Sequence, residues 1–488
     1  MGNTLTSVVN VTVRKTFRRI ATGKFTNEPN GNGVNGINGV NGINGHANGD
    51  MPGERSPLLP GAHPAGPASD ERSFWWAFFL DNKSTPGTDN ANPLVRWPAQ
   101  SWNVLKVTLL SSWINLLLVF VPIGILAGKQ EWGATWVFSL NFFAIIPLAA
   151  VLSFATEEIA HRLGETLGGL VNATFGNAVE LIVSIVALRA GEIEVVQASM
   201  LGSILSNLLL VLGMCFFLGG IYNMRDANGD GTEQSFAAGT AQTTCSLMAL
   251  SSASMIIPAA LYGVLDQNGD SHKQDSILLL SRGTSAILLL LYCMYLYFAL
   301  NTHKKLFEPE AQEARVEEAH EETLLGPWSA ALVLVAVTLV ISVNADYMVD
   351  SIDALVATGK ISKNFIGLIL IPIVGNAAEH VTACVVAVKN KMDLAMGVAI
   401  GSSIQIALLV TPALVMLGWA IGQPMTLRFE TFETIAFALS VMVVTYTVQD
   451  GKSNYLEGAM LLGLYLIIAV AFWASPSDAL DKSGLIGN

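Results

Sequence analysis

The chain has 488 residues, of which 52% are hydrophobic and only 13% are charged, about half the charged share usual in globular proteins. This composition excludes a soluble enzyme, a collagen-like fibre and a wholly disordered chain. The net charge of −12 argues against nucleic acid as a partner, because binding to a phosphate backbone depends on basic residues.

The first hundred residues are polar and contain no apolar stretch long enough to cross a bilayer. Residues 34–49 repeat Asn-Gly pairs with single aliphatic residues between them, which is too rich in glycine for a stable helix. Basic pairs near the start are not followed by an apolar core or a cleavage site, so no signal peptide is expected. We expect residues 1–100 to be a disordered tail.

Apolar stretches then recur at regular intervals, and most have the roughly 20 residues that a helix needs to cross about 30 Å of hydrocarbon. The sequence predicts an all-α polytopic membrane protein with eleven transmembrane helices, or ten if the weak tenth stretch is excluded. The expected spans are 107–127, 132–155, 166–188, 197–220, 238–264, 283–302, 328–349, 364–388, 394–420, 432–448 and 456–474.

The orientation is only weakly indicated. The loops and flanks on the side of the tail hold ten Lys and Arg residues, and those on the opposite side hold eight. By the positive-inside rule this favours a cytosolic N-terminus. With an odd number of spans, the C-terminal segment 475–488 would then lie on the far side.

An internal repeat divides the membrane part in two. Residues 176–180 (GNAVE) recur as residues 375–379 (GNAAE), and the pair 202–203 (GS) recurs as 401–402, in both cases at an offset of 199. The unit repeats after five spans, so the second copy is inverted relative to the first, an arrangement that places one binding site between two halves of a transporter. We therefore expect an extra first helix at 107–127, one five-helix repeat at 132–302 and a second at 328–474.

The repeated glutamates are the strongest candidates for function. Glu180 lies 14 residues into its apolar span and Glu379 lies 15 residues into its own, so both are expected near the bilayer midplane. A charged Asp or Lys there costs about 2.5–3.5 kcal/mol on insertion scales, and Glu should be similar. Because both residues are acids, they either share protons or bind a cation. Two carboxylates suit a divalent hard cation, and protons could replace it on the same oxygens.

The neighbours of the glutamates offer further oxygen ligands. Asn177 and Asn376 precede their glutamates by three positions and are expected to share a helical face with them. Gly176 and Gly375 allow close backbone approach or a helix break. The second helix of each repeat adds hydroxyl and amide groups, which either ligate a cation or pack helices together. These residues are Ser203, Ser206, Asn207, Ser402, Ser403 and Gln405.

Other polar residues are weaker candidates for a proton or cation access path. Glu157 and Glu158 end the second span, His161 follows them, and Asp346 lies near the end of the seventh; solvated helix ends would explain these residues equally well. His380 follows Glu379 and either influences a nearby acid or bonds a backbone carbonyl.

These motifs resemble a known family. GNAVELIVSIVAL with GSILSNLLLVLG, and GNAAEHVTACVVAVKNKMD with GSSIQIALL, are similar to the two signature repeats of vacuolar calcium/proton exchangers of fungi and plants, in the calcium/cation antiporter superfamily. The resemblance covers roughly residues 100–475 and is of the fungal type. It implies a Ca²⁺/H⁺ antiporter of the vacuolar membrane, with Glu180 and Glu379 binding Ca²⁺ and protons in turn.

Between the sixth and seventh spans, residues 303–327 form a loop rich in acid. Composition alone indicates a solvated acidic helix or linker. The resemblance implies an acidic helix near the cytosolic mouth that attracts or senses Ca²⁺. Its acidic residues are Glu308, Glu310, Glu313, Glu317, Glu318, Glu321 and Glu322.

The sequence thus predicts a secondary active transporter rather than an enzyme, with Ca²⁺ and H⁺ as its substrates, the lipid bilayer as its surroundings and no cofactor. No Gly-x4-Gly-Lys-Ser/Thr motif is present, so no nucleotide partner is expected. The alternatives are the same fold carrying Mn²⁺ or exchanging against Na⁺, and, from another class, a Ca²⁺ channel or a Ca²⁺-sensing scaffold.

Overall fold

The computed structural model describes residues 78–79, 85–226, 228–267, 272–307, 323–358 and 361–474. Most of the expected tail, the acidic residues 308–322 and the C-terminal segment 475–488 lie outside these ranges. The expected disordered tail extends to residue 100, but in the structure a helix already begins at Pro93. Asn92 caps this helix by accepting from the Leu94 N–H, and proline at the first helical position has its backbone already in helical geometry.

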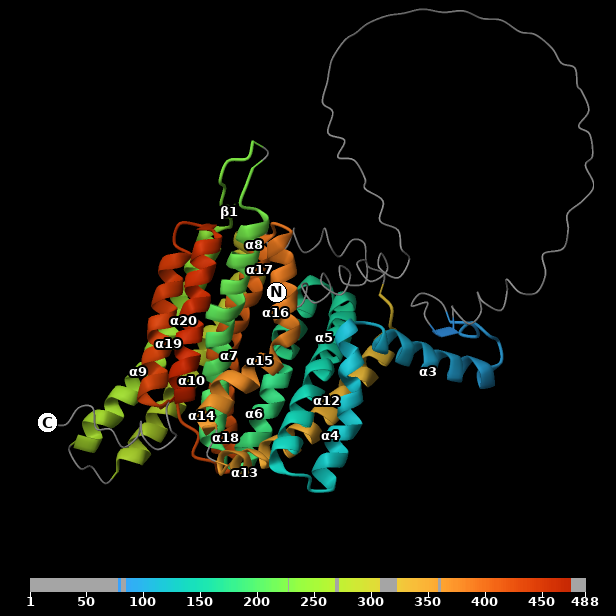
Figure 1. Cartoon of the computed structure of the whole chain (residues 1–488), viewed down its shortest axis with the longest axis horizontal. Coiled ribbons are helices and arrows are strands. Elements are labelled where there is room, and N and C mark those ends of the chain that lie inside the picture. The colour runs from blue at the N-terminus through green and yellow to red at the C-terminus, as the bar shows by residue number, and fades with distance from the viewer. Residues whose placement is uncertain are drawn as a thin grey trace, which may run out of the picture.

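The described chain is a bundle of helices (Figure 1). Its first half contains α3 (Pro93–Leu109), η1 (Trp113–Val119), α4 (Phe120–Lys129), α5 (Ala134–Phe175), α6 (Ala178–Ala190), α7 (Ile193–Leu205), η2 (Ser206–Val211), α8 (Leu212–Tyr222), β1 (Gln234–Ser235), α9 (Ala238–Gln267), α10 (Lys273–Tyr297), η3 (Phe298–Thr302) and η4 (Lys304–Phe307). Its second half contains α12 (Pro327–Asp350), α13 (Ile352–Val356), α14 (Lys363–Phe365), η5 (Ile366–Leu370), α15 (Ile371–Gly375), α16 (Ala377–Val388), α17 (Met392–Gln405), η6 (Ile406–Val410), α18 (Thr411–Ile421), α19 (Thr431–Thr447), β2 (Lys452–Ser453) and α20 (Tyr455–Ala474).

The apolar helices follow the expected spans closely. Within the described residues, seven helices are long and apolar enough to cross a membrane, and two bent pairs bring the number to nine. Two expected spans remain. The third begins in the last turns of α5 and continues as α6, and the tenth is the 17-residue α19. The chain is therefore a membrane protein with multiple apolar helices.

The first expected span, 107–127, straddles a sharp bend. Helix α3 ends at Leu109, and the following segment Trp113–Lys129 departs from it by 107°. Ser112 caps the new helix by accepting from the Ile114 N–H, which separates the two segments. The span therefore begins near Trp113, and α3 runs outward from the bundle (Figure 1).

The second and third spans are joined by helix rather than by the expected loop, since α5 runs continuously from Ala134 to Phe175. The chain nevertheless turns back on itself. A side chain added at Gly168 would meet the Ala160 carbonyl, whereas eight residues of straight helix would separate these positions by about 12 Å. The apolar spanning part of α5 accordingly ends at Leu163.

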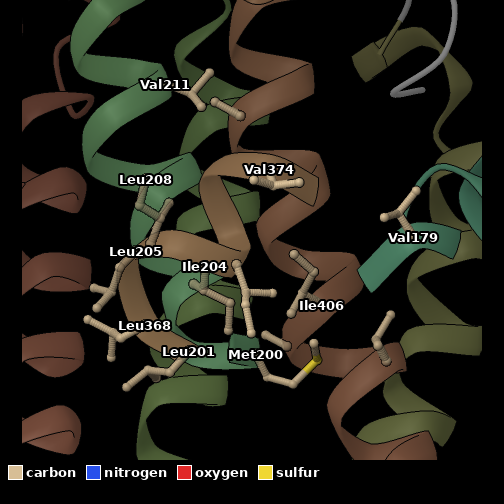
Figure 2. Packing of buried hydrophobic residues seen from close by; sticks show 14 of the residues in the cluster. Val179, Met200, Leu201, Ile204, Leu205, Leu208, Val211, Leu368, Val374 and Ile406 are labelled. Atoms are coloured by element: carbon tan, nitrogen blue, oxygen red, sulfur yellow. The ribbon is translucent and has the colours of Figure 1, made fainter. Parts of the chain in front are cut away.

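Close backbone packing holds the bundle together. Lipid tails are as apolar as leucine, so helix association in a membrane depends on small residues and fitted surfaces. Gly458 of α20 packs against the Gly213 carbonyl and the Phe217 N–H of α8, leaving no room for a side chain. Leu201, Leu205, Leu368 and Ile406 belong to a continuous buried layer that joins α7 to η5 and η6 (Figure 2).

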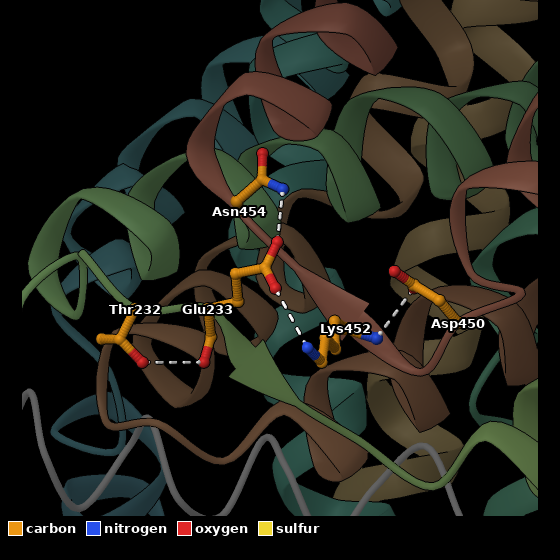
Figure 3. Close-up of polar contacts among 5 residues, drawn as sticks. All are labelled: Thr232, Glu233, Asp450, Lys452 and Asn454. Atoms are coloured by element: carbon orange, nitrogen blue, oxygen red, sulfur yellow. Dashed lines mark hydrogen bonds and ion pairs between the residues drawn. The ribbon is translucent and has the colours of Figure 1, made fainter.

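Polar loop contacts connect distant segments at one end of the bundle. β1 pairs antiparallel with β2, which joins the loop before α9 to the loop before α20. The Glu233 carboxylate lies 3.4 Å from Lys452 Nζ and accepts a 3.3 Å hydrogen bond from the Asn454 amide (Figure 3). Gln234 donates to the Ala387 carbonyl and to Asn390 Oδ1, at 3.0 and 2.8 Å. The two halves of the chain are therefore tied together here.

Candidate functional site

Both repeated motifs lie at helix breaks. Gly176 follows the end of α5 and Asn177 is the N-cap of α6, while Gly375 ends α15 and Asn376 is the N-cap of α16. The second break bends the span by 60°. The expectation that each asparagine shares a continuous helical face with its glutamate is therefore wrong. Each asparagine precedes the helix, and each glutamate lies in its first turn, because the glycine and asparagine residues interrupt the helical hydrogen bonding.

The two carboxylates are buried in the interior, with Glu180 only 5% exposed and Glu379 only 7%. Glu180 reaches across to the other half, since a Cβ atom added at Gly375 would lie 2.7 Å from its Oε1. Ser402 donates a 3.2 Å hydrogen bond to Glu379 Oε2. The motifs that lie 199 residues apart in sequence thus meet in one site.

Hydrogen bonds of the two repeated asparagines link the halves of the chain. Asn177 donates to Gln405 Oε1 at 2.6 Å, and Asn376 donates to Ser203 Oγ at 3.4 Å. Asn376 also donates to the Pro372 carbonyl at 3.1 Å, which holds its amide at the helix break. The structure thus places each asparagine in contact with a polar residue of the other half, Gln405 or Ser203.

Several buried oxygens of this cluster have no hydrogen-bond partner among the described residues. They are Glu180 Oε2, Asn177 Oδ1 and Asn376 Oδ1. Buried polar atoms are nearly always hydrogen-bonded in folded proteins, so unpaired ones gathered in one place call for an explanation. Carboxylate and amide oxygens are the ligands that a hard cation such as Ca²⁺ prefers. The donor set therefore fits a cation between the two halves.

The remaining candidate residues of the site differ in the groups that they contact. Ser206 Oγ lies 3.3 Å from His380 Nε2, so His380 contacts a hydroxyl rather than either of its expected partners. Ser403 donates to the Ala399 carbonyl of its own helix at 2.9 Å. Asn207 is fully buried, and neither atom of its amide group has a hydrogen-bond partner in the described part of the chain.

Two π-helical segments follow the site and were missed by the sequence analysis. η2 begins at Ser206, and η6 begins at Ile406, directly after Gln405. Single π-helical turns are frequent at functional sites because they change the direction in which successive side chains point. The residue pattern of these apolar stretches carries no signal that distinguishes them from ordinary helix.

The other candidates for an access path lie on α5 and α12. Glu158 is buried and accepts from the N–H groups of Leu324 and Leu325 at 3.0–3.1 Å, so it caps the segment before α12. Glu157 is buried beside it, whereas His161 and Asp346 are exposed. The description of Glu157 and Glu158 as a solvated helix end is therefore wrong, because α5 continues beyond them.

The sequence is similar to a known protein family and to characterised proteins of fungi and plants. The sodium/calcium exchanger protein family matches residues 133–301 and 329–474. The vacuolar calcium ion transporter of Schizosaccharomyces pombe is 51% identical over 371 residues, 76% of this chain and 87% of that protein. Vacuolar cation/proton exchanger 5 of Arabidopsis thaliana is 42% identical over 372 residues, 75% of this chain and 82% of that protein.

A solved structure shares the fold as well. The crystal structure of the Ca²⁺/H⁺ antiporter protein YfkE superposes with a TM-score of 0.60 at 34% sequence identity, covering 73% of this chain and 98% of that one. The resemblance to vacuolar calcium/proton exchangers, including fungal ones, is thereby confirmed. The chain belongs to the sodium/calcium exchanger protein family, whose members are transporters and exchangers.

Proposed function

We propose that this protein exchanges Ca²⁺ for H⁺ across the vacuolar membrane, moving Ca²⁺ out of the cytosol. Glu180 and Glu379 bind Ca²⁺ when ionised and protons when Ca²⁺ has left. The names of the relatives from fission yeast and Arabidopsis support the transported ions and the vacuolar location.

The group of buried oxygens without hydrogen-bond partners around Glu180 is the observation on which the proposal rests most. Two carboxylates balance the charge of one divalent cation, and the oxygens of Asn177 and Asn376 add neutral ligands. Backbone carbonyls at the ends of α5 and α15 are further candidates, because helix breaks at membrane depth commonly expose carbonyls to transported ions. Ser203, Ser206, Asn207, Ser402, Ser403 and Gln405 complete the proposed ligand set directly or through water.

Competition between ions on these oxygens accounts for exchange. Protonation removes the charge that holds Ca²⁺, so an acidic lumen releases the ion, and the neutral cytosol favours its binding. Lower pH should therefore weaken Ca²⁺ binding.

The proposal also covers the membrane topology of the protein. The chain has an extra first helix, two inverted five-helix repeats with eleven spans in all, and a cytosolic N-terminus. The acidic residues 308–322 then lie on the cytosolic side, where they attract Ca²⁺ toward the site.

Transport into proteoliposomes with an acidic interior tests the proposal. We expect ⁴⁵Ca²⁺ uptake that collapses on adding a protonophore, and its abolition in Glu180→Gln and in Glu379→Gln. Glu433→Gln is the matched control, because Glu433 is also buried, at 3% exposure, in the first turn of a membrane helix, but outside the site. Near-normal uptake by both site variants would refute the mechanism.

Ion substitution separates the proposal from its rivals. Uptake that requires Na⁺ and ignores the pH gradient would indicate a sodium-coupled exchanger. Stronger transport of ⁵⁴Mn²⁺ than of ⁴⁵Ca²⁺ would identify Mn²⁺ as the preferred substrate. Ca²⁺ uptake that is unchanged in the absence of both a pH gradient and a Na⁺ gradient would indicate a channel.

A further inference from the structure

A pocket between α9 and α17 reaches the candidate site from one end of the bundle. Its empty volume is about 560 Å³, including the open space at its mouth. Phe236 and Ala237, just before α9, and Leu306 and Phe307 of η4 line the pocket. Gln405, which accepts the hydrogen bond from Asn177, also lines it. The pocket therefore connects the end of the bundle near residues 303–307 to the residues around the carboxylates.

One wall of the pocket is a regularly spaced stripe on α17. Asp393, Gly397, Gly401 and Gln405 are each four residues apart, so they lie on one helical face. The stripe begins with a carboxylate in the first turn of the helix and ends with an amide at the site. The two residues between them are glycines, and at Gly401 the missing side chain leaves open space beside the helix.

Gly401 is not required for packing. A Cβ atom added there would meet nothing within 4 Å, whereas one added at Gly202, the position 199 residues earlier, would collide with the Leu368 carbonyl. The two glycines occupy the same place in the repeated motif, yet only Gly202 is needed for close contact between helices. At Gly401 the missing side chain keeps the pocket open.

The opposite wall is mostly apolar but presents the hydroxyl groups of Thr240 and Thr244. Thr240 donates to the Leu306 carbonyl at 2.7 Å and Thr244 donates to the Ala241 carbonyl at 2.9 Å, so both hydroxyl oxygens keep lone pairs for an incoming ligand. Asp393 adds a carboxylate near the mouth, where its Oδ1 accepts from the Ala237 N–H at 2.6 Å. Among the described residues that line the pocket, none is Lys, Arg or His. This lining favours a cation and disfavours an anion.

We infer that this pocket is the route by which the exchanged cation passes between the solution and Gln405, moving along the face of α17 between Asp393 and Gly401. The inference rests on the proposed function, because it takes the cluster around Glu180 and Glu379 as the destination.

Filling the pocket at Gly401 tests the route. Gly401→Leu should lower the initial rate of ⁴⁵Ca²⁺ uptake roughly tenfold or more, while equilibrium ⁴⁵Ca²⁺ binding to the purified protein stays within about twofold of the parent, because the route narrows but the ligands remain. Gly401→Ala fits the open space and should be intermediate. Gly463→Leu is the matched control, since a Cβ at Gly463 of α20 also meets nothing within 4 Å but lies outside the pocket. A Gly401→Leu protein that transports at the rate of the parent would overturn the inference.

Thiol labelling gives a second measurement that does not depend on transport. In a background where Cys215, Cys245, Cys293 and Cys384 are replaced by alanine, Gly401→Cys should react with a small cationic methanethiosulfonate reagent faster than Gly463→Cys, and Ca²⁺ should slow the reaction. Equal reactivity at the two positions, or no effect of Ca²⁺ at Gly401→Cys, would contradict the route.

The two proposals fail in different ways. If the parent protein shows no proton-coupled Ca²⁺ uptake, or if both glutamate variants transport normally, the proposed function fails. If the glutamate variants are inactive but neither Gly401→Leu nor labelling of Gly401→Cys behaves as expected, only the route between α9 and α17 fails.

Discussion

At the scale of single residues, the site is built from side chains that reach across to the other half of the chain. Asn177 bonds Gln405, Asn376 bonds Ser203, and the Glu180 carboxylate lies against Gly375. A change at any of these positions therefore affects side chains supplied by both halves. Small changes should alter ion binding more than they alter folding.

Gly375→Ala should weaken Ca²⁺ binding. The added Cβ would lie 2.7 Å from Glu180 Oε1, closer than real contacts allow, so the carboxylate must move. We expect a loss of affinity of roughly tenfold or more, equivalent to about 1.4 kcal/mol, measured by equilibrium ⁴⁵Ca²⁺ binding. Gly463→Ala, where the Cβ meets open space, should bind like the parent. Unchanged affinity in Gly375→Ala would show that Glu180 is not held in this position.

The neighbouring serines of α17 should differ in importance. Ser402 donates to the Glu379 carboxylate, whereas Ser403 donates to its own helix. A hydrogen bond to a charged group contributes about 1.5–3 kcal/mol, more than a neutral one. We therefore expect Ser402→Ala to reduce the initial rate of Ca²⁺ uptake more than Ser403→Ala does. The reverse order would mean that Ser403 turns toward the ion during transport.

At the scale of elements, the breaks and bends give each segment its role. The breaks before Asn177 and Asn376 place both glutamates in the first turn of a new helix, where backbone N–H groups stabilise a negative charge. The 107° bend after α3 separates a helix that leaves the bundle from one that belongs to it. Neither feature follows from the apolar stretches alone.

Helix α3 should lie in the interface of the membrane, parallel to its surface. It is nearly perpendicular to the following segment, and Leu94, Trp97 and Leu105 are 83%, 67% and 49% exposed, while Arg96 and Asn103 lie on the opposite face. Amphipathic helices with tryptophan commonly occupy this region. Spin labels at positions 94 and 105 should collide more with oxygen, and labels at 96 and 103 more with a water-soluble nickel chelate. Equal accessibility at all four positions would place α3 in water.

At the scale of the whole molecule, polar contacts at one end of the bundle join the two halves without covalent linkage. The Glu233–Lys452 ion pair (Figure 3), the β1–β2 pairing and the bonds of Gln234 all connect the loop before α9 to segments of the second half. These contacts hold α8, α16 and α20 together at this end. They should contribute unequally to stability, according to their burial.

Gln234→Ala should destabilise the protein more than Lys452→Ala. Gln234 is 3% exposed and donates a buried hydrogen bond to the Ala387 carbonyl, so its loss leaves that buried acceptor without this partner and should cost about 1–3 kcal/mol. The Glu233–Lys452 pair is exposed to solvent, and such pairs contribute less than about 1 kcal/mol. Melting in detergent, followed by size-exclusion chromatography, measures both. A larger effect from Lys452→Ala would contradict this order.

The sequence by itself determined the class of protein, the approximate positions of the apolar helices, and the two motifs that carry the resemblance to calcium/proton exchangers. These are encoded locally, because hydrocarbon thickness sets the length of an apolar stretch, and a repeated glutamate inside such a stretch is costly unless it binds something. The repeated motifs also predict Asn177, Asn376, Ser203 and Gln405 as candidate oxygen ligands, a role that stays a prediction.

Only the tertiary structure decided how these residues meet. The N-cap positions of Asn177 and Asn376, the contact of Ser206 with His380 and the capping role of Glu158 each depend on a partner more than 160 residues away or on the direction in which a broken helix continues. The pocket beside Gly401 depends likewise on where α9 lies relative to α17. Residue spacing specifies which side chains share a helix, but packing between distant helices decides which of them face each other.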